Sequence, residues 1–406
     1  MKLYSYIAIF LMFLVSGTVF CSMLHTSAFY LIFIAFSFFY AKISHIKLRR
    51  NDFIYFIVYS LWLLASSLYV GEFQSSSFNM VLGYLIMATG TFCILQSIDY
   101  NKFRYIFLNI AAFIALTSTI LYLLQQQNLI PLTLVHGNKN DQYLMFLFNN
   151  FGWGYPFDRL AGPYWEPGAF QIVLNYAVIL YFNELCHFKF NVKNGKKKMA
   201  IIVLALILTK STAGYINLAI LTVVIMANMK ITKRTFIKSV FAGIFFITAS
   251  FFMLSSDTYR EKMAQKGEKG TSYEIRKDDN LALLTMSLEK PILGYGINSP
   301  EFISRGKTLG NTTSSNGLLA LSSQLGCIFL ALYIFIFYRK LKIFFPKKTL
   351  LVLFLLLLLQ ATEVFIFFPL AFIFFFAKPP KPENPEEIPE DSPDTQTQSP
   401  QINGNV

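Results

Sequence analysis

The sequence predicts an all-α, polytopic membrane protein with about 12 transmembrane helices, or 11 under one alternative topology. The chain of 406 residues is 55% hydrophobic and only 14% charged, which is far more apolar than a soluble domain of this size. Its apolar residues come in runs of roughly 20, the length that an α-helix needs to cross ~30 Å of hydrocarbon. Its Lys and Arg cluster between these runs, as expected for cytoplasmic loops. The net charge of +13 therefore requires no nucleic-acid partner.

The first half of the chain is predicted to cross the membrane six times. The first run is too long for the apolar part of a signal peptide, so we expect it to remain as a span that starts in the cytoplasm. Basic clusters follow the second, fourth and sixth runs and mark their ends as cytoplasmic. The six runs lie at roughly 3–24, 26–41, 53–70, 78–98, 103–124 and 168–186.

Two later apolar stretches are ambiguous in length. Residues 199–229 are too many for one straight span and few for two, but basic clusters flank both ends. We therefore expect a hairpin that turns at Lys210–Gly214, with a single kinked span as the alternative. The stretch 349–377 contains Glu363, which would be costly at mid-bilayer depth, so a second hairpin with this carboxylate at the external surface is expected. Single spans are predicted at 239–255 and 317–338.

The topology leaves two large external loops, at about 125–166 and 256–313. In the second loop, Thr271–Glu274 has the spacing of a capping box and opens a helix that should end at Lys290. Residues 1–377 are expected to form one transmembrane domain. Residues 378–406 are acidic and Pro-rich, which predicts a disordered tail on the cytoplasmic side.

The external side of this topology gathers four cations, Arg159, Lys210, Arg276 and Arg305. Converging cations beside a low-dielectric wall suggest an anionic ligand, because guanidinium groups match phosphate oxygens. The alternative is ordinary ion pairing. Arg276 and Asp279 lie three residues apart on one predicted helix face, and Arg159 has acidic neighbours.

Glu166 lies immediately before Pro167, at the predicted N-terminus of the sixth span. A carboxylate is favoured there by the helix dipole, so helix capping is one role. The other is a general base that takes a proton from an attacking hydroxyl, or a group that orients a sugar. Trp165 has two roles open to it as well, stacking on a sugar ring or anchoring at the membrane interface. The four Cys lie in apolar runs without metal-ligand spacing, so neither a metal nor a cofactor is expected.

Several of these motifs together resemble the O-antigen polymerase and ligase superfamily over roughly residues 150–340. The first motif is Arg159-x-x-Gly162-x-x-x-Glu166-Pro167-Gly168, which closes the first external loop. The others follow in order: the turn Ser211–Tyr215, Arg276 before a short helix, Pro291-x-x-Gly294-x-Gly296, and Asn316 and Gly326 in the late span.

The resemblance implies a GT-C-like glycosyltransferase of the bacterial inner membrane, with both termini in the cytoplasm and the active site on the periplasmic face. Such enzymes need no metal, invert the anomeric centre and use glycans linked to undecaprenyl diphosphate. Arg159 and Arg276 would hold the diphosphate, with Glu166 beside them as the third catalytic residue. Substrate-binding residues would be Gly162, Trp165, Lys210, Tyr215, Asp279, Arg305 and Asn316. The bilayer and a chain-length regulator would be further partners.

One departure separates the two branches of that superfamily. The ligase branch usually carries His before the Asn that opens the late span, whereas Ser315 stands before Asn316 here. This favours a polymerase of O-antigen, capsule or exopolysaccharide. A ligase and a transporter or flippase of lipid-linked oligosaccharides are the alternatives. A second departure is Lys210-Ser211-Thr212, where relatives often have Ser-Arg.

Overall fold

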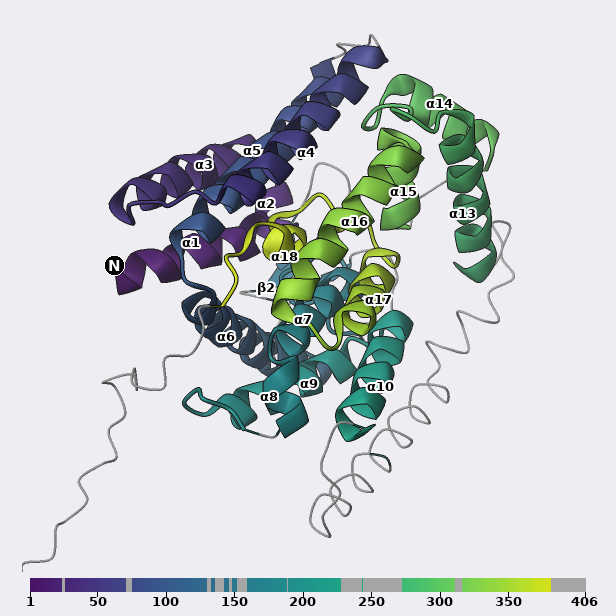
Figure 1. The fold of residues 1–406 in the computed structure, drawn as a ribbon. Helices are drawn as coiled ribbons and strands as arrows, with labels where there is room; N and C mark the ends of the chain where they lie inside the picture. The colour runs from purple at the N-terminus through teal and green to yellow at the C-terminus, as the bar shows by residue number, and fades with distance from the viewer. Residues whose placement is uncertain are drawn as a thin grey trace, which may run out of the picture.

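The computed structural model describes residues 1–23, 26–70, 75–129, 133–135, 142–145, 148–151, 159–187, 189–227, 243, 272–310 and 316–380. Within them the protein is a helical bundle (Figure 1). Four helices are long and apolar enough to cross a membrane: α3 (Thr26–Ile43), α4 (Arg50–Tyr69), α5 (Ser75–Ser97) and α6 (Tyr100–Gln126). The polytopic helical class is therefore confirmed, while the number of about 12 spans stays a prediction. The predicted span at 239–255 lies outside the described residues, apart from residue 243.

Shorter helices complete the bundle. In the first half these are α1 (Lys2–Val15), α2 (Val19–Met23), α7 (Pro167–Leu180) and α8 (Phe182–His187). In the second half they are α9 (Gly195–Leu208), α10 (Thr212–Ala227), α13 (Ser272–Glu289), α14 (Pro300–Thr308), α15 (Gly317–Leu325), α16 (Cys327–Phe344), α17 (Thr349–Gln360), η1 (Pro369–Phe372) and α18 (Ile373–Phe376).

Three of the predicted continuous spans are each split into two helices. The first span breaks at Gly17, the sixth at Tyr181 and the late span at Gly326. Gly17 has φ +84° and Gly326 has φ +94°, backbone conformations that glycine adopts without steric cost. Each of these glycines also lets another part of the chain approach. A Cβ at Gly326 would lie 2.1 Å from the Ile292 carbonyl oxygen.

Both predicted hairpins turn where the sequence indicates, and they differ in the second limb. The first consists of α9 and α10, which are joined by a tight turn at Lys210 with a φ of +46°. In the second, α17 ends at Gln360 and residues 361–368 form turns. The return limb is an irregular buried segment with only the short η1 and α18, because Pro369 disfavours a helical Phe368, which is extended at φ −89° and ψ 154°.

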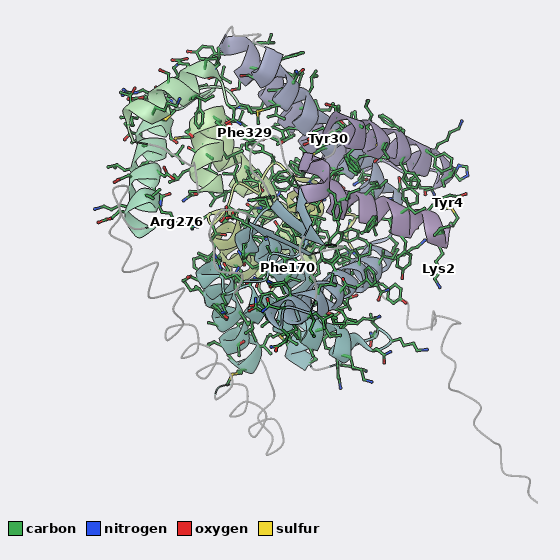
Figure 2. All side chains as sticks on the ribbon, turned by 180° about the vertical axis from the view of Figure 1, so that it is seen from behind. Lys2, Tyr4, Tyr30, Phe170, Arg276 and Phe329 are labelled. Atoms are coloured by element: carbon green, nitrogen blue, oxygen red, sulfur yellow. The ribbon has the colours of Figure 1, made fainter. Side chains whose placement is uncertain are left out.

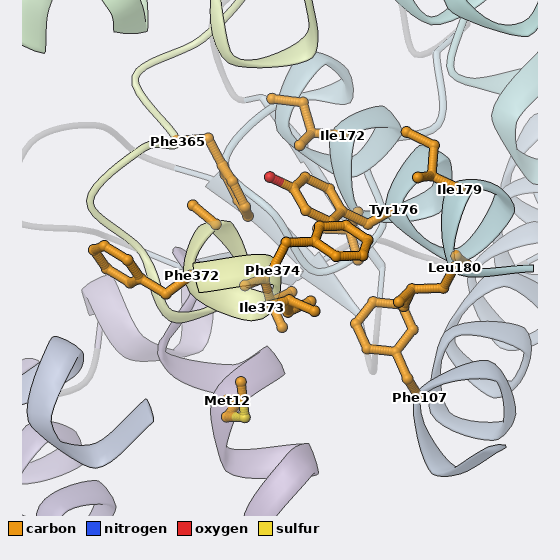
Figure 3. Packing of buried hydrophobic residues seen from close by; sticks show 14 of the residues in the cluster. Met12, Phe107, Ile172, Tyr176, Ile179, Leu180, Phe365, Phe372, Ile373 and Phe374 are labelled. Atoms are coloured by element: carbon orange, nitrogen blue, oxygen red, sulfur yellow. The ribbon is translucent and has the colours of Figure 1, made fainter. Parts of the chain in front are cut away.

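The core lies where this return limb meets α7 (Figure 3). The ring of Tyr176 on α7 stacks on Phe374 of α18 with centroids 6.3 Å apart. Almost all of α7 is buried, from Pro167 to Leu180, so this helix is covered on every side. By contrast, α3 and α6 expose large apolar side chains such as Leu31 and Phe113, as expected for surfaces that face lipid.

A buried polar cluster joins the ends of four elements. The Lys340 ammonium of α16 donates to Asp52 Oδ1 of α4 at 2.8 Å and to the Ala377 carbonyl at 3.1 Å. Gln96 of α5 donates to Asp52 Oδ2 at 2.9 Å and to the Phe376 carbonyl at 2.7 Å. Asp52 and Lys340 are 3% and 2% exposed, so the charges are withdrawn from solvent. The cluster fixes the end of the return limb to α4, α5 and α16.

The remaining described parts lie outside the apolar bundle. Helices α13 and α14 stand together at one edge, where α13 packs on α15 (Figure 1). The sequence predicted this helix, and its bounds agree with the predicted capping box and Lys290 end. Three short antiparallel strands, β1 (Thr133–Val135), β2 (Gln142–Met145) and β3 (Phe148–Phe151), pair in that order within the first large loop. The sequence did not predict them.

Candidate functional site

The segment 159–166 is held on two sides by backbone hydrogen bonds. The Leu160 amide donates to the Leu208 carbonyl at the end of α9, at 2.9 Å. The Val19 amide, at the start of α2, donates to the Pro163 carbonyl at 2.8 Å. Next to it, Thr18 forms an antiparallel bridge with Tyr164. The break in the first span thus provides the backbone groups that fix this segment in place.

Arg159 is half-buried and anchored by one edge of its guanidinium group. Its Nε donates to the Thr209 carbonyl at 3.2 Å, in the turn between α9 and α10. Arg159 is also close enough to Tyr215 to interact with it electrostatically, and the Tyr215 hydroxyl donates to the Ile207 carbonyl at 2.5 Å. Because the Nε edge is occupied, the planar guanidinium group is fixed in direction, which suits directional hydrogen bonding to an anion.

Glu166 occupies the N-cap position of α7, yet its side chain makes no hydrogen bond to the described first turn. Its Oε1 accepts from the indole Nε1 of Trp165 at 3.2 Å. The Trp165 ring in turn packs against Phe368, with centroids 5.6 Å apart, and over Gly17, where a Cβ would lie 2.1 Å from the ring. Trp165 therefore orients Glu166, and the carboxylate is not used as a hydrogen-bonding cap.

A second carboxyl group, Glu363, lies directly against this site from the turn between α17 and η1. A Cβ built on Gly168, in the first turn of α7, would be 2.6 Å from Glu363 Oε1, so only glycine leaves room for the carboxyl group there. The same oxygen is 3.7 Å from a terminal nitrogen of Arg276. Arg276 lies near the start of α13 and is labelled in Figure 2. The Glu363 side chain is 12% exposed, whereas that of Arg276 is 50% exposed.

Burial and the neighbouring Glu166 raise the pKa of the Glu363 carboxyl well above its ordinary value. Desolvation is the largest cause, followed by a hydrogen bond to Glu166 and the repulsion between the two carboxylates. Arg276 and Arg159 act in the opposite direction because both stabilise the ionised form. The structure therefore gathers two guanidinium groups and two hydrogen-bonded carboxyl groups from three distant parts of the sequence.

This constellation combines two chemical capacities. Two guanidinium groups that lie near each other can bind an anion and stabilise negative charge as it develops. A carboxyl pair in which one member has a raised pKa can hold a proton on one group and accept one on the other. The groups that provide these two functions lie at the N-terminal end of α7, where the helix dipole also stabilises negative charge.

Other residues proposed from the sequence lie around the site with structural contacts of their own. Asn316 caps α15, because its Oδ1 accepts from the amides of Leu318 and Leu319 at 3.1 Å each. The next residue, Gly317, packs so tightly that a Cβ would lie 2.4 Å from the Glu363 carbonyl oxygen. Asn316 thus fixes the start of α15, whose first residue, Gly317, packs against the backbone of Glu363.

The turn residues Gly162 and Lys210 both have positive φ, +57° and +46°. A Cβ on Gly162 would lie 2.8 Å from the Phe170 ring, so this glycine lets the site segment fold onto α7. Lys210 follows Thr209, whose carbonyl holds Arg159. Asp279 is fully buried in α13, one turn after Arg276.

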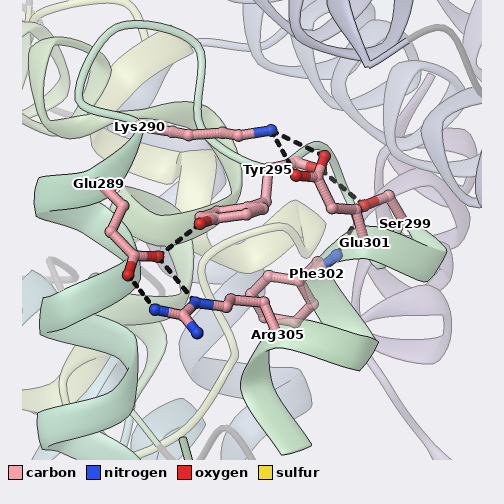
Figure 4. Close-up of polar contacts among 7 residues, drawn as sticks. All are labelled: Glu289, Lys290, Tyr295, Ser299, Glu301, Phe302 and Arg305. Carbon is pink, nitrogen blue, oxygen red and sulfur yellow. Dashed lines mark hydrogen bonds and ion pairs between the residues drawn. The ribbon is translucent and has the colours of Figure 1, made fainter. Parts of the chain in front are cut away.

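Arg305 is placed elsewhere (Figure 4). On α14 it forms a two-pronged ion pair with Glu289, and Glu289 also accepts from Tyr295. Glu289 and Arg276 lie 13 residues apart on α13, which is about 20 Å along the helix axis. Within the described chain, Arg305 therefore joins α14 to the far end of α13, as the ion-pair alternative predicted for such cations.

Glu363 was not among the site residues proposed from the sequence, where it was placed at the external surface only to avoid the cost of burial. A signal was present, because Glu363 is the single acidic residue in the apolar stretch 349–377. An ionisable residue inside such a stretch is by default a candidate functional group. What the sequence could not show is that its turn reaches the N-terminus of α7.

Comparison with known proteins adds one positive finding. Residues 199–334 match the family model described as O-antigen ligase. The match confirms the resemblance to the O-antigen ligase and polymerase superfamily, and it supports a membrane protein that handles lipid-linked glycans. No curated protein matches the chain. The matched region contains Arg276, whereas Arg159, Glu166 and Glu363 lie outside it.

Proposed function

We propose that this protein is a glycan polymerase of the bacterial inner membrane. It transfers a growing polysaccharide from undecaprenyl diphosphate to a hydroxyl of the next lipid-linked repeat unit, on the periplasmic face. The observation that carries the proposal is the convergence of Arg159 and Arg276, 117 positions apart in the sequence (276 − 159), on the Glu363 carboxyl. The family match over residues 199–334 supports the substrate class.

In the proposed reaction, the acceptor hydroxyl attacks the anomeric carbon on the face opposite the diphosphate. A new bond forms between the acceptor oxygen and this carbon as the bond to the diphosphate oxygen breaks, so the configuration inverts. The diphosphate leaves with the electron pair, and Arg159 and Arg276 stabilise the charge that it gains. The proton of the acceptor hydroxyl passes to a carboxylate of the site.

A cavity beside the site suits the lipid part of such a donor. It has a volume of about 240 Å³ and lies between α1, α2 and α6. Phe10, Leu14, Phe113 and Pro163 are among its lining residues, and Pro163 belongs to the same segment as Arg159. Phe10 and Phe113 are 40% and 52% exposed, so the cavity opens toward the lipid-facing surface. We propose that part of the polyprenyl chain lies there while the diphosphate meets the arginines.

Two other functions compete with the polymerase. A ligase would use the same donor, but Ser315 stands where that branch usually has His. A transporter of lipid-linked sugars is expected to carry charged groups or broken helices near the bilayer midplane. The helix breaks at Gly17 and Gly326 fit that class as well, so the position of the charged groups is the distinguishing feature. Here Arg159 and Glu363 lie in connections at helix ends, which favours transfer chemistry over transport.

The test compares polysaccharide chain lengths in a deletion strain complemented with variants. Arg159→Ala and Arg276→Ala should abolish long chains while the protein remains in the membrane at wild-type level. Lys307→Ala is the matched control, because Lys307 is an exposed cation on α14. It should give the wild-type length distribution.

The same strains separate the alternatives. Loss of a polymerase leaves single repeats that are still attached to their acceptor, whereas loss of a ligase leaves polymer on the lipid carrier. Loss of a transporter leaves repeat units on the cytoplasmic face, inaccessible to an external glycosidase. Long chains at normal abundance in both arginine variants would refute the assignment.

A further inference from the structure

The carboxyl pair in the site has features that the transfer reaction alone does not explain. Three charged groups lie around the Glu363 carboxyl, which makes four in all. Glu166 and Arg159 come from the segment before α7, and Arg276 comes from α13. If both carboxyls were ionised, the four charges would cancel and the two neighbouring carboxylates would repel each other. One shared proton removes that repulsion and leaves a net charge of +1 for the diphosphate.

The two carboxyl groups have unequal surroundings. Glu363 is almost buried and its ion pair with Arg276 is long, at 3.7 Å, so solvation of a negative charge there is poor. Glu166 is half-buried, receives the indole N–H of Trp165, and stands at the N-terminus of α7. An N–H donor and the positive end of a helix both stabilise negative charge. The proton is therefore better held by Glu363 and the negative charge by Glu166.

We propose that Glu363 is a proton-holding partner of Glu166, and that Glu166 is the group which takes the proton from the attacking hydroxyl. This inference rests on the proposed function. As the acceptor O–H bond breaks, its proton moves to Glu166 and its electron pair forms the new bond to the anomeric carbon. The pair then holds two protons, and one is released to water after the diphosphate leaves. Glu363 acts through Glu166 as a positioning residue.

Donor binding strengthens this arrangement. The side chain of Arg276 is 50% exposed and only loosely paired, so it is free to turn from Glu363 to an arriving diphosphate. Arg276 favours the ionised form of Glu363 in the free protein. When the diphosphate neutralises it, the proton is held more firmly on Glu363 and the negative charge stays on Glu166.

Isosteric amides distinguish the two roles. The full-length protein is reconstituted in lipid vesicles, and the initial rate of chain extension is measured with purified lipid-linked repeat units over a range of pH. Glu166→Gln removes the proton acceptor and should lower the rate at least ~100-fold. Glu363→Gln mimics the protonated carboxyl and should keep the rate within roughly tenfold of wild type. The neutral amide can still hydrogen-bond to Glu166, so the position of Glu166 is largely preserved.

The pH profile supplies a readout that a merely structural role would not change. Wild type should show a bell-shaped profile, because the pair is inactive after gaining a second proton and weaker after losing the shared one. Glu363→Gln cannot lose that proton, so its alkaline limb should disappear while the acid limb remains. Glu363→Ala, which removes the partner, should be slower than Glu363→Gln at every pH.

A different result would overturn each of the two proposed roles. A Glu363→Gln protein that is as inactive as Glu166→Gln, or that keeps the full bell-shaped profile, overturns the proton-holding role. A Glu166→Gln protein with near-normal rates overturns the role of Glu166 as proton acceptor. Failure of the proposed function looks different. In that case the wild-type protein extends no chains in the vesicles, or the arginine variants extend them normally.

Discussion

Conservative replacement of the two arginines by lysine should have unequal effects, although both changes keep the positive charge. Arg159 uses its Nε to hold the Thr209 carbonyl at 3.2 Å, and in the proposed reaction the same guanidinium group also contacts the diphosphate. A lysine has one ammonium group, which cannot occupy both positions. The described contact of Arg276 is different, because it is a single long ion pair with Glu363 and the Arg276 side chain is half exposed. A lysine at this position can therefore make a similar contact.

The expected magnitudes follow from these environments. Arg159→Lys loses one charge-assisted hydrogen bond at a half-buried position, about 1.5–3 kcal/mol, which corresponds to roughly a 10- to 150-fold lower rate. Arg276→Lys changes a solvent-screened contact and should cost less than about 1 kcal/mol, or about fivefold. The assay is the initial rate of chain extension in vesicles at saturating acceptor and varied donor.

Equal losses in the two lysine variants would refute this reasoning, because they would show that charge alone determines the contribution of each residue. A larger loss at Arg276 would show that the guanidinium group whose geometry matters is that of Arg276 and not that of Arg159. The corresponding alanine variants provide the scale, since each should be slower than its lysine counterpart. Membrane abundance of each variant, measured by immunoblotting, excludes a trivial loss of protein.

Three further outcomes are expected. Lys340→Met leaves the buried Asp52 without its ammonium partner and should lower the free energy of unfolding in detergent by about 3–5 kcal/mol, and a wild-type melting temperature would contradict this. Leu14→Trp should fill the apolar cavity and raise the KM for the donor without changing the fold. The control Leu61→Trp, at a lipid-exposed position, should leave this KM unchanged. Equal KM values for the two variants would exclude the cavity as the binding site of the polyprenyl chain. Arg305 lowers the pKa of Glu289 to about 2, so the stabilisation by this pair is present above the unfolded value of about 4.3 and is lost as pH falls through about 2. Pepsin should therefore cleave α14 only as the pH approaches about 2. Cleavage of the wild-type protein at a clearly higher pH would argue against the stabilising role of the pair.

Much of the helical framework could be predicted because its signals are local. The turn at Lys210 follows from basic clusters on both sides of a 31-residue stretch, and the start of α13 follows from capping-box spacing. The breaks at Gly17 and Gly326 were missed for a physical reason. Glycine is common within membrane helices, and only the approach of Trp165 or of Ile292 shows that the backbone must bend there.

The site was predictable in part. The sequence located Arg159, Glu166 and Arg276 through charge, helix-end position and turn motifs. It could not locate Glu363, because the contact depends on how the irregular return limb packs and on the absence of a side chain at Gly168. Similarly, nothing local indicated that Arg305 would be bound by Glu289 at the far end of α13.

The packing of Trp165 against Gly17 and against Phe365 and Phe368, in the turn that also carries Glu363, has a consequence for how the protein is made. Trp165 lies between a break in the first helix and the turn after α17, so its pocket draws on segments about 350 residues apart in synthesis. The carboxyl pair can form only after α17 has been inserted and its following turn has folded back. A nascent chain that has completed residues 199–334 already carries the region that matches the family model and Arg276, yet it lacks Glu363. The proposed site is therefore completed late in biogenesis, when the hairpin that begins with α17 closes on the first helix.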